Sequence, residues 1–305
     1  MKIFLKSLAA LLFLALAVWA IRSDTLPDRA GAGGAGAASL PGRSTGDAAW
    51  RTAPVWDDGR AEYCAYDVTW ARYGHLFAGS ALLVVVKEPW APDLDVKADT
   101  PRPDGFEVLK LNHIRDVRTG IYTYHQMASV FARRDDGTLR KINAASTEAC
   151  GVSTALMTRG RLETHSYFDG QGDRATDYPA GALPEDGLPL FLRGYVTGAA
   201  PETLSLFPSL MHGAFPKLEP APWRVEKRSL PAVETAAGPL PGVEIRLTGA
   251  AGVLAYTFAV ESPHRLLRFE RSDGTVYRMA KCERIPYWAQ HNPGDESWWP
   301  ARPAS

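Results

Sequence analysis

The sequence predicts a mainly β fold built on one continuous antiparallel sheet. Three observations support this prediction: segments of aromatic and β-branched residues that alternate with a period near two, turn residues that recur about every 8–12 positions, and the absence of a sustained helical period. The longest strand-like region covers residues 106–151 and carries many polar residues. We expect this region to be the centre of the sheet, and the rest of the chain to flank or cover it.

The first half of the chain predicts strands joined by tight turns. A strand is expected over residues 61–73, where aromatic and β-branched residues alternate, and another over residues 80–87, which are apolar on both faces and therefore central. Asp136-Gly137 is a hairpin signal, because glycine tolerates the positive φ of tight hairpin turns. A meander of three antiparallel strands is therefore predicted over residues 108–117, 121–133 and 139–145.

The second half combines hairpins with a proline-rich segment. Residues 161–178 predict a hairpin, and eleven of the 23 prolines then lie between Pro179 and Pro241. Central strands do not accommodate so many prolines, so this segment is expected to cover the sheet, with at most one or two short helices, one of them over residues 188–195. Further strands are predicted over residues 223–230, 242–248, 253–261, 265–272 and 275–285 of the same sheet.

Residues 1–22 differ in composition from the rest of the chain. Lys2 and Lys6 precede an uncharged stretch of mostly Leu and Ala, and Ala17 and Ala20 are small residues of the kind that signal peptidase needs. This pattern is typical of a signal peptide or an uncleaved N-terminal anchor, with a core helix as the remaining alternative. We therefore expect an exported protein, in the periplasm or anchored to the membrane and facing the periplasm. It would contact a membrane only through this segment, if the segment is uncleaved.

Three further regions follow the N-terminal segment. Residues 23–46 are mostly Gly, Ala, Ser and Pro, and they are expected to be a disordered linker because they cannot bury enough apolar surface to offset their chain entropy. Residues 47–290 are predicted to form a single β-rich domain. Residues 291–305 are predicted to be an irregular tail that is rich in proline and tryptophan.

The charge of the chain argues against one class of function. There are 34 basic and 34 acidic residues and no cluster of five or more Lys or Arg, whereas nucleic-acid binders usually carry a clear basic excess. We therefore expect no nucleic-acid partner. Neither a phosphate-binding P-loop nor an HExxH zinc motif is present, and the sequence indicates no cofactor and no catalytic residue.

The cysteine content allows one internal disulfide. In an exported protein, three cysteines form at most one such bridge and leave one thiol, and the leading candidate pair is Cys64–Cys150. Other pairings with Cys282 and three free, buried thiols stay open. The spacing fits no zinc pattern, because the chain has no CxxC and no cysteine close to a pair of histidines.

Two histidines lie on either side of the turn at Gly120. His113 and Asp116 come before this turn and His125 after it, so an antiparallel hairpin would bring the histidines to within a few residues of cross-strand register. A metal site of His113, His125 and Asp116 is one hypothesis. The alternative is that these polar residues cap strands and pair across the hairpin.

The same hairpin contains candidate ligand-binding residues. Tyr122 and Tyr124 share one face of their predicted strand, and Met127 lies on the other face. A curved sheet with an aromatic and methionine lining is able to hold a lipid or another apolar small molecule. The alternative is that these side chains form the hydrophobic core.

Two stretches carry a resemblance to a known group of proteins. They are WDDGRAEYCAYDVTWARYG at residues 56–74, and FEVLKLNHIRDVRTGIYTYHQMASVF at residues 106–131 followed by EACG at residues 148–151. Here the chain resembles an uncharacterised family of exported bacterial proteins, of the domain-of-unknown-function type, which is similar in outline to periplasmic half-barrel lipoprotein carriers. The resemblance covers residues 55–151 well and the remainder loosely. It implies a strongly bent antiparallel sheet, or half-barrel, in the cell envelope, and it assigns no catalytic residues.

Some members of this family carry the label septum formation inhibitor Maf. That label implies a cytoplasmic nucleotide pyrophosphatase with a Ser-Pro-Arg-Arg opening that binds phosphate. The chain has no such opening, and its predicted export signal is incompatible with a cytoplasmic enzyme. The label is therefore not supported by this sequence.

Three functions follow as hypotheses. The first is a non-catalytic binding module of the cell envelope, whose concave sheet face holds an apolar ligand or an envelope protein partner. The second is a structural or scaffolding envelope protein, which predicts a filled sheet and an exposed edge or aromatic patch. The third is a metal-assisted hydrolase, which requires His113, His125 and an acid to converge.

Overall fold

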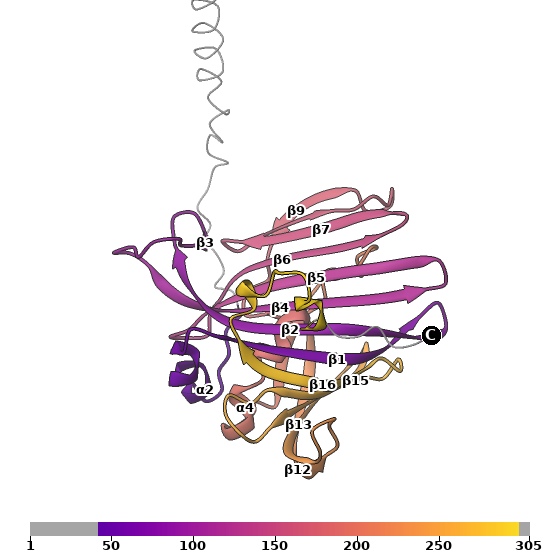
Figure 1. Cartoon of the computed structure of the whole chain (residues 1–305). Coiled ribbons are helices and arrows are strands. Elements are labelled where there is room, and N and C mark those ends of the chain that lie inside the picture. Colours follow the sequence, from indigo (N-terminus) through magenta and orange to yellow (C-terminus); the bar gives the residue numbers. More distant parts are fainter. Residues whose placement is uncertain (1–41, 299–305) are drawn as a thin grey trace, which may run out of the picture. The chain divides into compact units, whose positions relative to one another are not determined.

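One large sheet organises the protein. The computed structural model describes residues 42–298, and within them 16 strands are joined in a single sheet (Figure 1). The predicted mainly β fold and the predicted sharing of one sheet by both halves of the chain are confirmed. In the described part of the chain, no helix is long and apolar enough to span a membrane.

The strands alternate with short turns along most of the chain. Their bounds are β1 Ala61–Arg72, β2 His75–Ala91, β3 Val96–Lys97, β4 Phe106–Thr119, β5 Tyr122–Arg133, β6 Leu139–Glu148, β7 Gly151–Thr158, β8 Arg161–His165, β9 Asp173–Asp177, β10 Leu183–Pro184, β11 Thr203–Phe207, β12 Ala221–Val233, β13 Leu240–Gly249, β14 Gly252–Ala259, β15 Leu266–Arg271 and β16 Val276–Ile285. The helical elements are α2 Ala49–Thr52, α3 Leu188–Phe191 and α4 Gly194–Thr197, with single 3₁₀ turns η1 Pro54–Asp57, η2 Glu185–Gly187, η3 Tyr287–Ala289 and η4 Asp295–Trp298.

The two halves of the chain meet where β1 pairs with β16. The strand order runs from β10 to β16, then through β1, β2 and β4 to β9, and β3 pairs with β2. The pairs described are antiparallel, with the short β10–β11 pair as the parallel exception. Strands β9 and β10 stand at the two ends of this order and are not paired with each other, so the sheet is open.

One strand of the central region was not predicted. The sequence predicts a meander of three strands there, and β7 adds a fourth, paired with β6 and β8. Its buried positions are Ser153, Ala155 and Met157. Two of these inward side chains are small and one is polar, so apolar and polar residues hardly alternate along the strand. The period-two signal that marks the other strands is therefore weak in β7.

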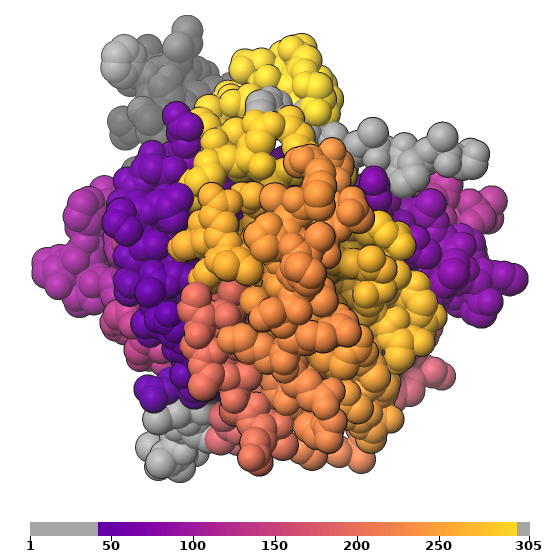
Figure 2. Space-filling model, turned by 90° about the horizontal axis from the view of Figure 1, so that it is seen from below, coloured from indigo at the N-terminus to yellow at the C-terminus, as the bar shows by residue number. Residues whose placement is uncertain are grey.

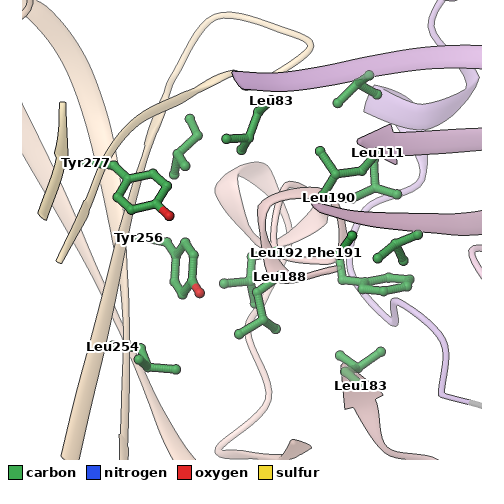
Figure 3. Packing of buried hydrophobic residues seen from close by; sticks show 14 of the residues in the cluster. Leu83, Leu111, Leu183, Leu188, Leu190, Phe191, Leu192, Leu254, Tyr256 and Tyr277 are labelled. Atoms are coloured by element: carbon green, nitrogen blue, oxygen red, sulfur yellow. The ribbon is translucent and has the colours of Figure 1, made fainter. Parts of the chain in front are cut away.

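The sheet bends strongly around the proline-rich segment. Strands β5 and β15 stand five places apart in the strand order, yet both contact η2: the side chain of Val130 lies beside Gly187, and Arg271 forms an ion pair with Glu185. A flat sheet would hold strands five places apart roughly 24 Å from each other. Figure 3 shows the result: Tyr256 and Tyr277 point from one side of the bend toward α3, and Leu83 and Leu111 do so from the other.

The covering segment supplies apolar side chains that fill this bend. Leu188, Leu190, Phe191 and Leu192 are at most 1 % exposed, and they belong to the same core cluster as inward residues of both sheet halves (Figure 3). The short helix predicted over residues 188–195 is present as the two four-residue helices α3 and α4. Prolines lie in and between these short elements, which explains why the segment packs as cover and not as central strands.

The predicted linker ends earlier than expected. Residues 42–46 pack against the domain: Ser44 is 5 % exposed and donates a hydrogen bond from its Oγ to the carbonyl oxygen of Phe191, and Thr45 bonds to the hydroxyl of Tyr195. In Figure 2, indigo residues from the start of the domain lie beside salmon residues of the covering segment. The predicted boundary at residue 46 is wrong, because this short run satisfies its polar groups on the domain. The predicted signal peptide or anchor, and the linker up to residue 41, lie outside the described residues.

The disulfide joins the first and the last strand of the chain, which are neighbours in the sheet. Cys64 on β1 and Cys282 on β16 are direct cross-strand partners and are bonded to each other, and Cys150 is a free, exposed thiol. The preferred pair Cys64–Cys150 is therefore wrong, because Cys150 lies in the β6–β7 turn and not opposite β1. The bridge closes a loop of 218 residues, and by the chain-entropy model a loop of this length stabilises the folded state by about 5 kcal/mol.

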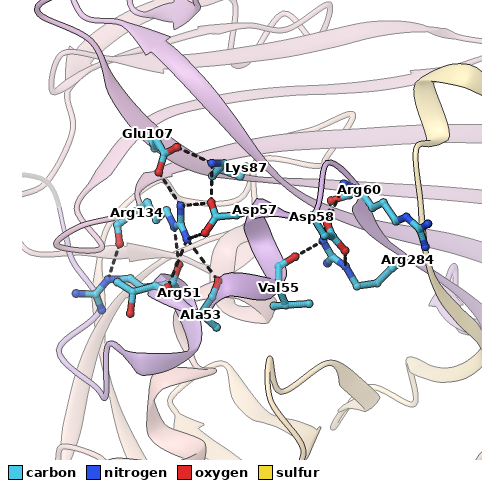
Figure 4. A network of polar contacts seen from close by, with 11 residues as sticks. Arg51, Ala53, Val55, Asp57, Asp58, Arg60, Lys87, Glu107, Arg134 and Arg284 are labelled. Atoms are coloured by element: carbon cyan, nitrogen blue, oxygen red, sulfur yellow. Dashed lines mark hydrogen bonds and ion pairs between the residues drawn. The ribbon is translucent and has the colours of Figure 1, made fainter.

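An ion-pair network fixes the start of the domain to the sheet. Arg134 binds both carboxylate oxygens of Asp57, at 2.7 and 2.9 Å, and also binds Glu107 at 2.7 Å (Figure 4). Lys87 contacts the same two carboxylates, at 2.7 and 2.6 Å. A separate pair joins Arg284 to Asp58 at 2.7 Å. Arg134 and Arg284 therefore each have a carboxylate partner, whereas Arg51 donates to the carbonyl oxygens of Arg134 and Asp135.

Candidate functional site

The bend leaves a cavity on the inner face of the sheet. Its volume is about 230 Å³, and its walls come from both halves of the sheet and from the covering segment. The lining residues are Trp70, Ala71, Arg72, Leu83, His113 and Arg115 from β1, β2 and β4, then Tyr256, Leu266, Phe269, Arg271, Asp273, Thr275 and Tyr277 from β14 to β16 and their turns, and Glu185, Asp186, Pro189, Ser209, Met211 and His212 from the cover.

The inward face of β4 explains why the cavity is polar on one side. Leu109 and Leu111 point into the hydrophobic core, and the next two inward positions are His113 and Arg115. Side chains two residues apart on a strand share a face, so β4 changes from apolar to polar along one face. This change places an imidazole and a guanidinium at the wall of the cavity.

A hydrogen-bond network connects this wall to β16 and to the cover. The Tyr277 hydroxyl lies 3.1 Å from His113 Nε2 and accepts a hydrogen bond from Arg115 Nη1 at 3.3 Å. Arg115 Nε donates to Gln126 Oε1 at 3.0 Å, and Gln126 Nε2 donates to the carbonyl oxygen of Met211 at 2.7 Å. Strands from both halves of the chain and the covering segment thus hold Arg115 in place.

Both histidines of the cavity are neutral at pH 7. Burial, helped by the charge of Arg115, lowers the pKa of His113 to about 3. Burial also lowers the pKa of His212 to about 4, with smaller contributions from Arg115 and Arg72. The Nδ1 atom of His113 is buried and has no hydrogen-bond partner among the described residues.

The second guanidinium of the wall belongs to Arg72, at the end of β1. It lies over the rings of Trp70, Tyr73 and Tyr124, with its Cζ atom 5.5, 4.7 and 5.5 Å from the three ring centroids. Arg115 lies 4.6 Å from the centroid of Trp70. Both arginines therefore pack on the same indole, where cation–π attraction supports their positions.

The acidic residues of the cavity are engaged by other groups. Glu185 forms an ion pair with Arg271, and the exposed Asp273 accepts a hydrogen bond from the amide of Thr275 at 2.8 Å. The carboxylate of Asp186 accepts bonds from Ser209 Oγ at 2.5 Å and from the amide of Leu210 at 2.7 Å. Burial raises the pKa of Asp186, and these two bonds oppose that rise.

The structure does not form the predicted metal site. Asp116 and His125 are direct cross-strand partners, and their side chains meet on the outer face, with His125 Nδ1 2.6 Å from Asp116 Oδ1. His113 is three positions from Asp116 on the same strand and therefore points to the opposite, inner face. Within residues 42–298, no group of three His, Cys, Asp or Glu side chains is arranged to hold a metal ion.

The predicted ligand-binding residues do not line the cavity. Tyr124 is 1 % exposed and packs edge-on against Trp70 with ring centroids 5.1 Å apart, and its hydroxyl bonds to that of Tyr73. Tyr122 is half-buried against the core, and Met127 faces the outer side of β5. The alternative interpretation, in which the tyrosines are part of the hydrophobic core, describes their environment better.

The residues that do line the cavity were not predicted as a set. Arg115 and Tyr277 are separated by 162 positions, and no local motif relates them. The one sequence signal that points to the site is the pair of polar residues, His113 and Arg115, at inward positions of a strand whose earlier inward positions are Leu. Such a change predicts a polar patch on an inner face, although it does not identify the partners.

A short run near the start of the domain has the spacing of a serine nucleophile motif. Residues 42–46 read Gly-Arg-Ser-Thr-Gly, but no strand precedes Ser44 within the described residues, as a nucleophile elbow requires. The Ser44 hydroxyl donates to the carbonyl oxygen of Phe191 at 3.0 Å and is buried. This serine is therefore part of the packing of the domain start.

Comparisons with known proteins identify no family for this chain. No protein-family model matches the sequence, and no curated protein matches it. A solved structure, the β-barrel-like protein of a domain of unknown function, DUF1849, from Brucella abortus, is similar with a TM-score of 0.44 and 11 % sequence identity. The match covers 74 % of this chain and 98 % of that one. At this level the similarity identifies neither a family nor a function for the chain.

Proposed function

We propose that the protein is a non-catalytic binding module and that the cavity on the inner face of the sheet is its ligand site. The cavity itself is the observation that carries this proposal. Concave sites between sheet and cover, with apolar and aromatic walls and a few oriented polar groups, are typical of small-molecule binding. Trp70, Leu83, Met211 and Phe269 supply apolar wall here, and Arg72 and Arg115 supply oriented donors.

The cavity also helps to choose among the other hypotheses. A scaffold that acts only through its outer surface predicts a filled inner face, and this face contains about 230 Å³ of unfilled space beside partly buried charges. A ligand site accounts for such a space, which is lined by both apolar surface and oriented polar groups. The hydrolase hypothesis loses its proposed ligands, because His113 and His125 are on opposite faces of the sheet. The apolar ligand of the original hypothesis is better replaced by one with both apolar and polar parts.

The proposal is tested by filling the cavity. Leu83 lines the cavity, whereas its neighbour Leu82 is equally buried on the other face of β2. With prodan, a neutral fluorescent probe, we expect Leu83→Phe to weaken binding at least tenfold and Leu82→Phe to leave it within about twofold. Circular dichroism and thermal unfolding of both variants check that they are folded. Equal prodan binding by the two variants, or failure of the wild-type protein to bind both prodan and an anionic naphthyl probe, would refute the proposal.

We also propose that the protein acts outside the cytoplasm. The disulfide between Cys64 and Cys282 supports this location, because structural disulfides persist mainly in oxidising compartments. The composition of residues 1–22 supports it independently. Mass spectrometry of the protein from a fractionated native cell should find it in the periplasmic or membrane fraction with this bridge oxidised, and recovery of a reduced protein from the cytoplasm would exclude the proposed location.

A further inference from the structure

We infer that the ligand of the cavity is a small organic anion, whose charged head lies between Arg72 and Arg115 and whose apolar body lies against Trp70 and the neighbouring aromatic walls. This inference rests on the proposed function, and it names the chemical class of the ligand. The chemistry that it requires is a carboxylate or a similar oxyanion on a compact, unsaturated or aromatic body.

Two guanidinium groups of the cavity lack an acidic partner. Within residues 42–298, no carboxylate is in ion-pair contact with Arg72 or Arg115, and the Nε atom of Arg72 is buried without a hydrogen-bond partner. The contacts of Arg115 are to Gln126, Tyr277 and the ring of Trp70, all of them uncharged. A partly buried charge without a counter-charge is costly, and an anionic ligand would compensate it.

The acids lining the cavity are engaged by other partners. Glu185 is paired with Arg271, Asp186 accepts bonds from Ser209 and the Leu210 amide, and Asp273 accepts one from the Thr275 amide. None of these carboxylates is therefore placed to occupy the position between Arg72 and Arg115. An anion from solution does not have to displace an internal partner there.

His113 supplies a neutral imidazole to the same wall. Arg115 donates to the hydroxyl of Tyr277, so this hydroxyl is free to donate its own proton to Nε2 of His113. In a neutral imidazole, this arrangement assigns the remaining proton to Nδ1, which is buried and unpartnered. His113 therefore adds no charge of its own to this wall, and the positive charge that lacks an acidic partner comes from Arg72 and Arg115.

The remaining walls and the size of the site also fit an organic anion. Trp70, Tyr256 and Phe269 present aromatic surface to the cavity, and Leu83, Leu266 and Met211 present aliphatic and thioether surface. A fully hydrated inorganic ion would leave these surfaces unused, whereas an amphipathic organic anion covers them. The cavity of about 230 Å³ limits the ligand to a compact molecule.

The test compares two probes that differ in charge and little in shape. The carboxylate 1-naphthylacetate and its neutral amide 1-naphthylacetamide are titrated into the purified full-length protein by isothermal titration calorimetry. We expect the carboxylate to bind at least tenfold more tightly than the amide. Arg115→Gln and, independently, Arg72→Gln should reduce this preference to within about twofold, while Arg228→Gln, which removes an exposed arginine of β12, should leave it unchanged.

The outcomes separate this inference from the proposed function. Equal binding of carboxylate and amide, together with prodan binding that Leu83→Phe removes, would overturn the anion inference and leave the binding module intact. The anion inference would also be overturned if Arg228→Gln lowered the preference for the carboxylate as much as Arg115→Gln does. The preference would then reflect the net charge of the protein and not this site. If neither naphthyl probe nor prodan binds, the proposed function fails and the inference fails with it.

Discussion

Arginine has opposite surroundings in two regions of this molecule. At the start of the domain, Arg134 holds Asp57 and Glu107 (Figure 4), and Arg193 is buried with Glu62 at 2.6 Å. In the cavity, Arg72 and Arg115 pack on aromatic rings and uncharged polar groups. In the first region, carboxylates of the protein neutralise the charge of these arginines. In the second, the fold positions the charge without neutralising it, which is the arrangement expected of a ligand site.

The largest effect is expected from breaking the most buried internal pair. The side chains of Arg193 and Glu62 are 1 % and 6 % exposed, and Arg193 also donates to the carbonyl oxygens of Pro189 and Pro263. Arg193→Met leaves an unpaired buried carboxylate and should lower the free energy of unfolding by roughly 3–5 kcal/mol. Denaturant unfolding measures the loss. As a control, Arg228→Met removes an arginine whose side chain is 65 % exposed, and its buried partner Glu244 keeps an ion pair with Arg246, so stability should change by less than about 1 kcal/mol. Similar losses in the two variants would contradict this account.

The cavity histidines and the ion-pair network should affect stability in different pH ranges. His113 and His212 have folded-state pKa values of about 3 and about 4, below the unfolded value of 6.5, so the unfolded chain binds more protons between these limits. Stability should therefore fall as the pH is lowered from about 6.5 to about 4, by up to about 1.4 kcal/mol per pH unit for each histidine. The ion-pair network responds at lower pH, because its hydrogen bonds to Arg134 and Lys87 lower the pKa of Asp57.

Histidine variants test this separation. Unfolding free energies measured from pH 7 to pH 4 should show a shallower slope in His113→Gln/His212→Gln than in the wild-type protein. His264, which lies outside the cavity and whose pKa is also lowered by burial, remains in the double variant and keeps part of the slope. An unchanged slope would mean that the cavity histidines are accessible to protons in the folded state.

The smallest effect on stability is expected in the cavity itself. Arg115→Gln removes a charge that has no acidic partner, and glutamine retains hydrogen-bonding groups for Gln126 or Tyr277. We expect the free energy of unfolding to change by less than about 1 kcal/mol without ligand. Thermal unfolding with and without 1-naphthylacetate should show stabilisation by the ligand in the wild-type protein and little in the variant. A loss comparable to that of Arg193→Met would show that Arg115 has a structural role.

The amount of structure that could be predicted differs between local and distant features. The period-two pattern and the turn residues locate almost all of the longer strands, because strand formation and tight turns depend on neighbouring residues. Strand β7 escaped prediction because its buried positions are Ser153, Ala155 and Met157. The pairing of Cys64 with Cys282 was also not predicted, since it depends on β1 lying next to β16 at the far end of the sequence.

The sequence by itself determined the mainly β architecture, the covering role of the proline-rich segment and the polar positions His113 and Arg115 on β4. These follow from composition and from the alternation of side chains along a strand. Only the tertiary structure decided which face each polar residue occupies and what it meets there. It separated His113 from His125, placed Tyr277 beside Arg115 from 162 positions away, and left two guanidinium groups without an acid. Such relations depend on the curvature and strand order of a sheet, which no local segment of the chain specifies.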